Sequence, residues 1–263
     1  MATSSKGLFG SSLARKYWMA ASGLFLTLFL VGHLLGNLQL LDTSEHGKHA
    51  FNLYAAFMTT FPVVKILSYL TYGSIILHVI DGIVLTRQNR AARPVRYAKE
   101  NGAANASWAS RSMALLGILT LVFIIVHMKS FFAEMHWGDV EQYTYTDPES
   151  GVNHSLKDLW TITVLAFQNI WYTLFYVLAM VALGFHLSHG VSSGFQSLGL
   201  NHPKYNGLVK YFGLGFSILV PALFALIPIY LYVQKPQVDA TIEQTKAVVE
   251  HVVVDLETET QSN

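Results

Sequence analysis

The stretch GLFLTLFLVGHLLGN, residues 23–37, decides the fold, because it places one histidine, His33, inside an otherwise apolar run. Three other long apolar runs each contain a histidine at a comparable position, namely His78, His127 and His186. A lone histidine on an apolar helix is more often a satisfied interior residue than a ligand. Ionisable side chains inside a membrane are costly, however, and usually mark a functional site. Four such histidines on four separate runs therefore indicate a shared site.

Five apolar runs of about 20–26 residues follow one another along the chain. At about 1.5 Å per residue, a helix of this length crosses a hydrocarbon layer about 30 Å thick. The sequence, with 52% apolar and 13% charged residues, predicts an all-α, polytopic membrane bundle of five transmembrane helices and excludes a soluble domain. The runs are Tyr17–Leu41, Pro62–Leu85, Met113–Phe132, Phe167–Val191 and Leu208–Val233.

The connections and the tail complete the predicted organisation. Apolar residues recur at helical spacing in Asp42–Phe61, which predicts a short interfacial helix there. The polar and aromatic connection Glu134–Ala166 is expected to form an outer cap. Residues 1–233 thus make one membrane domain, and the acidic residues 234–263 are expected to be a mobile tail, to which the sequence assigns no role. The chain has no cysteine, which excludes disulfides and cysteine-held iron–sulfur clusters from this chain.

Lysine and arginine are unequally divided between the two sides of the predicted bundle. If successive spans alternate in direction, eleven lie on the side of the N-terminus and six on the other side. Because cytoplasmic loops carry the excess of basic residues, we expect the N-terminus in the cytoplasm and the C-terminus outside. Six of the eleven lie between Arg87 and Arg111. This basic fringe gives no reason to expect a nucleic-acid partner.

The alternating directions also convert each histidine's position into a depth. His33 and His127 fall about 6–7 Å outside the midplane, and His78 and His186 about 5–9 Å inside it. Two layers of facing imidazoles about 11–16 Å apart are what two stacked haems, each with two histidine ligands, need in a helix bundle. We therefore predict an outer iron held by His33 and His127 and an inner iron held by His78 and His186. Iron with two histidine ligands favours electron transfer over oxygen binding.

Small and polar residues near the predicted ligands fit the same interpretation. Gly32 and Gly36 lie within a turn of the first histidine, and Gly82 follows His78 by one turn. A flat haem between helices needs small neighbours, although ordinary helix packing explains such glycines equally well. Either Ser74, four residues before His78, or the backbone carbonyl one turn back is placed to bind the second ring nitrogen of that histidine and so fix its tautomer.

Further candidates lie toward the two predicted surfaces. His189 competes with His186 for the inner iron but lies closer to the cytoplasmic surface, where haem propionates require donors. The candidate propionate donors are His189, Arg15, Arg87 and Arg111. Asp81 lies near the same surface, either paired with an arginine or acting in a proton relay. At the outer ends of the spans, a polar set including Asn37 and Lys65 is able to hydrogen-bond a quinone, although such residues are also common at helix ends.

Taken together, short stretches along the chain resemble the dihaem cytochrome b membrane subunit of succinate:quinone oxidoreductases, the succinate dehydrogenases and fumarate reductases. The resemblance extends to about residue 233 and is closest to the single-subunit, five-helix form of bacteria that use menaquinone. The matching stretches are Ser12–Lys16, Gly32-His33, Gly36-Asn37, Phe51-Asn52, Tyr54-Ala55, His78 with Asp81-Gly82, Asn89-Arg90, Arg93-Pro94, Val122–Val126 before His127, Phe185-His186 and His189-Gly190.

The resemblance implies two haem b groups, with His33 and His127 on the distal haem and His78 and His186 on the proximal one. It also implies a flavoprotein and an iron–sulfur protein docked on the cytoplasmic face of a bacterial cytoplasmic (inner) membrane. The chain would anchor these partners among membrane lipid and pass electrons between the iron–sulfur protein and menaquinone or another quinone, without acting on succinate itself. Gly184 stands where some dihaem fumarate reductases carry a glutamate linked to proton return, so that mechanism is not implied here.

Two other functions remain open. The chain would also suit a cytochrome b anchor of another quinone-linked membrane oxidoreductase, although one ligand per span is unusual for those families. A non-haem, proton-coupled transporter could use the histidines as a relay, but that function needs helices broken at mid-depth. Among the five runs, only the last has internal prolines, Pro221 and Pro228.

Overall fold

The computed structural model describes residues 11–92, 106–146 and 151–247. These residues belong to two compact units. Unit 1 comprises Met1–Leu34, Ile66–Ile125 and Leu178–Phe224, and unit 2 comprises Leu35–Lys65, Val126–Val177 and Ala225–Asn263. Each of the five long helices therefore contributes one part to each unit.

Five helical stretches of 25 to 30 residues in the described chain are long and apolar enough to cross a membrane. Their number confirms the sequence-based prediction of five membrane-length helices. In the second and third, only 6% of the most apolar window is buried, so most of their apolar side chains point outward, as lipid contact requires. The stretches are Leu13–Leu41, Pro62–Ala91, Met113–Trp137, Ile170–Ser197 and Asn206–Val233.

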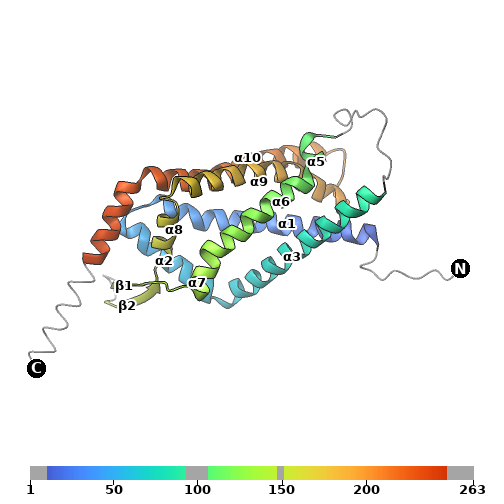
Figure 1. The fold of residues 1–263 in the computed structure, drawn as a ribbon. Coiled ribbons are helices and arrows are strands. Elements are labelled where there is room, and N and C mark those ends of the chain that lie inside the picture. The colour runs from blue at the N-terminus through green and yellow to red at the C-terminus, as the bar shows by residue number, and fades with distance from the viewer. Residues whose placement is uncertain (1–10, 93–105, 147–150, 248–263) are drawn as a thin grey trace, which may run out of the picture. The chain divides into compact units, whose positions relative to one another are not determined.

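Most of these stretches are single α-helices (Figure 1). The first is α1 (Ser12–Asn37), extended by the 3-10 turn η2 (Leu38–Leu41). The second is α3 (Pro62–Ala91). The third joins α6 (Met113–His127), the π-helical segment η3 (Met128–Ala133) and α7 (Glu134–Trp137). The last two are α9 (Ile170–Ser197) and α10 (Asn206–Val233).

The fourth long helix begins later than the sequence predicts. A separate helix, α8 (Leu159–Ala166), ends before the expected start at Phe167. The side-chain oxygen of Asn169 then accepts hydrogen bonds from the backbone N–H groups of Trp171, at 2.9 Å, and Tyr172, at 3.3 Å. An asparagine in this position satisfies N–H groups that a helix leaves unpaired at its start. Asn169 thus starts α9 three residues after α8 ends.

The connections contain short helices and a hairpin (Figure 1). A short α5 (Trp108–Arg111) precedes α6. The predicted helix between the first two spans is confirmed as α2 (Glu45–Thr60), whose start is capped by Ser44 accepting from Gly47 N–H at 3.2 Å. The expectation of an all-α fold is wrong in one place. β1 (Gln142–Thr146) and β2 (Asn153–Lys157) pair antiparallel, with Gln142 opposite Lys157. The alternating Tyr and Thr of QYTYT favour a strand.

The expectation of a mobile tail is corrected for residues 235–247, which are helical. Val238 is fully buried, and the Thr241 hydroxyl donates to the Thr43 carbonyl at 2.8 Å. Thr245 is also buried. Residues 238, 241 and 245 lie on one face of a helix, and this face packs inward. The weak apolar stripe at residues 248–253 lies outside the described residues.

A buried ion pair connects several of these elements within unit 2. Lys48 Nζ in α2 lies 2.7 Å from Asp158 Oδ2, and the two side chains are 4% and 9% exposed. The side-chain amide of Asn52 donates to Asp158 Oδ1 at 3.1 Å, and its oxygen accepts from Trp160 N–H at 2.9 Å. Lys48 also donates to the Thr245 hydroxyl at 3.2 Å. Asn52 is therefore part of a structural network.

We expect Lys48→Met to destabilise the protein by about 3–5 kcal/mol, because Asp158 keeps a buried charge without its partner. Thermal unfolding of the detergent-solubilised chain measures this. Lys65→Met is the matched control, since Lys65 is exposed, and the double variant Lys48→Met/Asp158→Asn should regain part of the loss. A melting temperature equal to the control's would contradict the role of the pair.

We expect a loss of stability at high pH that depends on Tyr143 in β1. Burial, followed by the negative charges of Glu45 and Asp158, raises the pKa of Tyr143 to about 12 from its ordinary 10.0. Between these values the unfolded chain releases a proton that the folded chain retains. The contribution is therefore complete below pH 10.0 and is lost as the pH rises through about 12. Ultraviolet titration of phenolate, compared with Tyr143→Phe, tests this. Ionisation of Tyr143 at its ordinary pKa would disprove it.

Candidate metal centre

Two of the four predicted ligands, His78 and His186, are in edge-on ring contact in unit 1. His78 belongs to α3 and His186 to α9, and their ring centroids are 6.2 Å apart with the ring planes at 69°. The sequence pairs them by inferred depth alone, because 108 residues separate them in the chain. The structure brings together the two histidines expected to share the inner iron.

A serine from a third helix holds the ring of His78. The Ser22 hydroxyl in α1 lies 3.1 Å from His78 Nδ1. Since the same hydroxyl donates to the Trp18 carbonyl at 2.8 Å, its oxygen is placed to accept from the ring N–H. That tautomer leaves Nε2 unprotonated and able to bind a metal. A partner expected from sequence was Ser74 on the same helix as His78, and this expectation is corrected to Ser22.

His186 carries a buried ring nitrogen that lacks a partner. Within the described chain, its Nδ1 is buried and has no hydrogen-bond partner. Leaving such a group unsatisfied costs about 1–3 kcal/mol. A bound group or an ordered water would remove this cost.

Two glycines lie beside the pair, and Gly23 allows a close approach of its helix. A Cβ on Gly23 in α1 would lie 3.1 Å from His78 Cε1, which is tighter than an ordinary contact. A Cβ on Gly117 in α6 would lie 3.8 Å from His186 Cε1. The site is thus built by α1, α3, α6 and α9. The sequence analysis missed both glycines, because the signal is the contact between helices and not the spacing along one helix.

The spacing of the two rings fits one metal between two imidazoles. A metal–imidazole bond is about 2.0–2.1 Å long, and a five-membered ring with bonds near 1.33 Å has its centre about 1.1 Å from each atom. Two such ligands on opposite sides of one metal place their ring centres about 6.2–6.4 Å apart. The observed 6.2 Å agrees with this value. Groups of three or more potential metal ligands are absent from the described residues, but a haem iron takes only two from the protein.

The competing residue His189 lies one turn beyond His186 in α9. The ring that faces His78 is that of His186, and the described contacts include no ring contact between His78 and His189. The assignment of His186 as the ligand stays a prediction that this geometry favours.

The other two predicted ligands belong to different units. His33 lies in unit 1, stacked on Phe29 at 5.3 Å and tilted against Phe224 at 5.6 Å. His127 lies in unit 2 as the last residue of α6, and its Nδ1 is 3.3 Å from the Tyr176 hydroxyl. The π-helical segment η3 follows it directly, and π-helical turns are frequent at functional sites. The pairing of His33 with His127 stays a prediction.

The predicted propionate donors have different surroundings. Arg15 Nη1 lies 2.9 Å from Asp81 Oδ1, a half-buried ion pair that favours a structural role for Asp81 over a proton relay. Arg111 donates to the Ala106 carbonyl at 3.0 Å, at the start of α5. Arg87 is exposed near the end of α3.

The candidate glycines also differ. A Cβ on Gly36 would lie 2.6 Å from the ring of Tyr54, so close packing against α2 explains this glycine. A Cβ on Gly82 would meet only the end of Met19 at 3.5 Å, and none of the described atoms lies within 4 Å of a Cβ on Gly32. Gly32 therefore leaves room one residue before His33.

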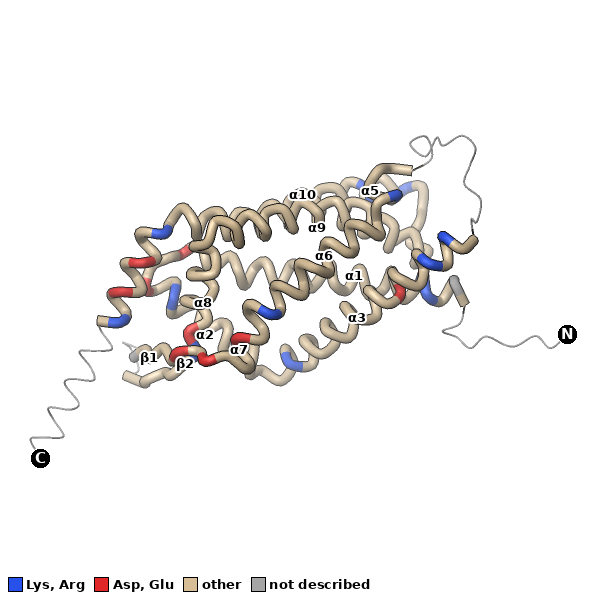
Figure 2. The backbone as a smooth tube through the Cα atoms, viewed as in Figure 1, with Lys and Arg blue, Asp and Glu red and all other residues tan. Residues whose placement is uncertain are grey.

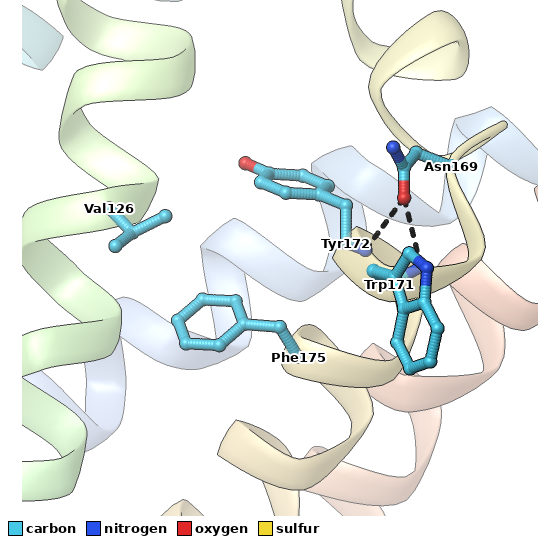
Figure 3. Close-up of a pocket in the computed structure, with 5 residues that line it drawn as sticks. All are labelled: Val126, Asn169, Trp171, Tyr172 and Phe175. Carbon is cyan, nitrogen blue, oxygen red and sulfur yellow. Dashed lines mark hydrogen bonds between the residues drawn. The ribbon is translucent and has the colours of Figure 1, made fainter.

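The two predicted quinone contacts, Asn37 and Lys65, differ in their exposure. Asn37 is half-buried at the end of α1, and Lys65 is exposed in the first turn of α3. A shallow pocket of about 370 Å³ in unit 2 instead collects other side chains (Figure 3). The lining residues are Val126, Asn169, Trp171, Tyr172 and Phe175. The aromatic residues of this pocket could not be singled out from the sequence, because they are ordinary members of an apolar run there.

Comparisons with protein-family models, with curated proteins and with solved structures each find no match.

Proposed function

We propose that the chain is a membrane-anchored, dihaem cytochrome b that carries electrons to or from a quinone, as a subunit of a succinate:quinone oxidoreductase. The observation that carries the proposal is the 6.2 Å approach of His78 and His186 from two apolar, membrane-length helices. A haem would supply one-electron chemistry at that position. The assignment to a succinate:quinone oxidoreductase rests on the resemblance described above.

The residues around the inner pair fit a haem iron in kind as well as in spacing. Ser22 accepts from one side of the His78 ring and leaves the other nitrogen for iron. The buried Nδ1 of His186 has no hydrogen-bond partner among the described residues. These two histidines would hold the iron, and an iron with two histidine ligands would be suited to pass electrons and not to bind oxygen.

The distribution of charge supports the proposed orientation (Figure 2). In the described part of unit 1, seven basic residues accompany a single acidic residue, Asp81, whereas unit 2 carries six basic and eight acidic residues. Cytoplasmic segments carry the excess of basic residues, so we assign unit 1 to the cytoplasmic side, where the flavoprotein and the iron–sulfur protein would dock. The seven are Arg15, Lys16, Arg87, Arg90, Arg111, Lys204 and Lys210.

Two observations weigh on the alternatives. A proton-coupled transporter needs helices interrupted at mid-depth, whereas α3, α9 and the proline-containing α10 are each continuous. The anchor of another quinone-linked oxidoreductase would carry similar haems. Succinate-dependent reduction of the haems in the purified complex separates that alternative from the proposed one.

We expect His186→Ala to lose the inner haem and to retain the outer one, because it removes one of two facing ligands. His189→Ala is the matched control on the same helix and should retain both haems. Reduced-minus-oxidised optical spectra of the purified variants measure the haem content. Loss of a haem from the His189 variant, with both retained in the His186 variant, would reverse the assignment.

We expect charge reversal at the end of α3 to weaken docking of the soluble partners. Arg87→Glu with Arg90→Glu should reduce the flavoprotein and iron–sulfur protein that co-purify, more so at low salt, because a charged patch steers association. Lys235→Glu in unit 2 is the control. Arg93 and Arg96, from the same predicted patch, lie outside the described residues. Undiminished co-purification would mean that these arginines only set the topology.

A further inference from the structure

A short series of hydrogen bonds in unit 2 joins His127 to the wall of the pocket. His127 Nδ1 at the end of α6 lies 3.3 Å from the Tyr176 hydroxyl in α9. The Tyr176 hydroxyl lies 2.9 Å from that of Tyr172, one turn earlier on the same helix. Tyr172 in turn lines the pocket together with Val126 and Phe175 (Figure 3).

We infer that Tyr176 and Tyr172 are positioning residues for His127, and that they link the iron held by this histidine to a ligand in the pocket. The inference rests on the proposed function, because it requires His127 to bind haem iron through Nε2. It adds a residue-level connection between that iron and a quinone-type ligand.

The tautomer of His127 determines which group donates in each hydrogen bond of this series. When Nε2 is the ligating atom, Nδ1 carries the proton and donates to the Tyr176 oxygen. The Tyr176 hydroxyl is then left to donate to the Tyr172 oxygen. The Tyr172 proton has no role within the series, so it is available to an acceptor in the pocket. When His127 binds iron, the Tyr172 hydroxyl is therefore available to donate a hydrogen bond in the pocket.

The local fold holds Tyr176 in this place. Residues 172 and 176 are one turn apart, so both side chains lie on the same face of α9, and Asn169 fixes the start of that helix. Phe167 meets the Tyr176 ring edge-on at 5.0 Å, and Phe131 of η3 does so at 6.3 Å. Tyr176 is only 6% exposed. In such an apolar surrounding, a hydrogen bond is electrostatically stronger than in water.

The pocket suits a flat apolar ring that carries a carbonyl group. Val126, Trp171 and Phe175 supply apolar and aromatic walls. Figure 3 shows the Tyr172 ring extending from α9 toward α6, with its hydroxyl at the far end. A volume of about 370 Å³ lies within the usual range for small-molecule sites. The ligand class with these properties is the quinone ring, bound through its carbonyl oxygen to Tyr172.

The hydrogen bond to Tyr176 has a measurable effect on the iron. Donation from Nδ1–H makes a ligating imidazole more basic, which favours ferric over ferrous iron. In Tyr176→Phe, which keeps the ring and removes the hydroxyl, the midpoint potential of one haem should rise. A tenfold shift toward ferrous iron corresponds to about 59 mV for one electron. A merely structural role of Tyr176 would not produce this selective shift.

The test is a spectroscopic redox titration of the full-length chain in detergent, with Tyr211→Phe as the control because Tyr211 is exposed on α10. Two haems in the wild type, with one potential raised in Tyr176→Phe, are the expected result. Absence of haem from the wild type would refute the proposed function itself. Two haems with unchanged potentials in Tyr176→Phe would refute the present inference alone.

Tyr172→Phe provides the second arm, since it leaves the bond between Tyr176 and His127 in place. This variant should retain both haems, shift the same potential by less, and bind menadione, a naphthoquinone without a tail, at least tenfold more weakly by perturbation of the haem spectrum. If Tyr172→Phe binds menadione as the control does, the pocket is not connected to His127 in the way inferred. If Tyr176→Phe fails to fold, the Tyr172→Phe measurements still decide whether the pocket is connected to His127.

Discussion

The cost of placing a polar ring inside an apolar helix governs this structure. An imidazole in a membrane span must find a hydrogen-bond partner or bind a ligand. His78 meets Ser22, and His127 meets Tyr176, so each has one ring nitrogen held by a hydroxyl. The second nitrogen of each ring, Nε2, takes no part in that hydrogen bond. The need for a partner, which makes buried histidines costly in free energy, also makes them suitable metal ligands.

Buried polar groups in unit 2 also need partners, and they find these partners in one another. Lys48 and Asp158 neutralise each other, and Asn52 donates to Asp158 and accepts from the Trp160 backbone N–H. This network belongs to α2, the start of α8 and the helix over residues 235–247, all within unit 2. Unit 2 therefore uses its buried charges for stability, whereas the ring pair of unit 1 is left with a buried nitrogen that lacks a protein partner among the described residues.

Sequence patterns predicted the features that depend on one helix at a time. Hydrophobic length gave five spans, helical spacing gave α2, and depth along each span paired His78 with His186. The features that depend on contacts between helices could not be read in this way. Ser22 and Gly23 are unremarkable in their own run and become part of the site only where α1 meets His78. The helix over residues 235–247 was missed because an acidic composition hid three buried positions on one face, and the start of α9 was misplaced because Asn169 caps it inside an apolar run.

The most direct test of the account is the haem content and ligation of the purified chain. Haem extraction should give two haem b per chain, and electron paramagnetic resonance of the oxidised protein should show low-spin ferric iron, as two histidine ligands to each iron require. A chain that is folded and helical but contains no haem, or whose iron is high-spin with an open coordination position, would contradict the central claim.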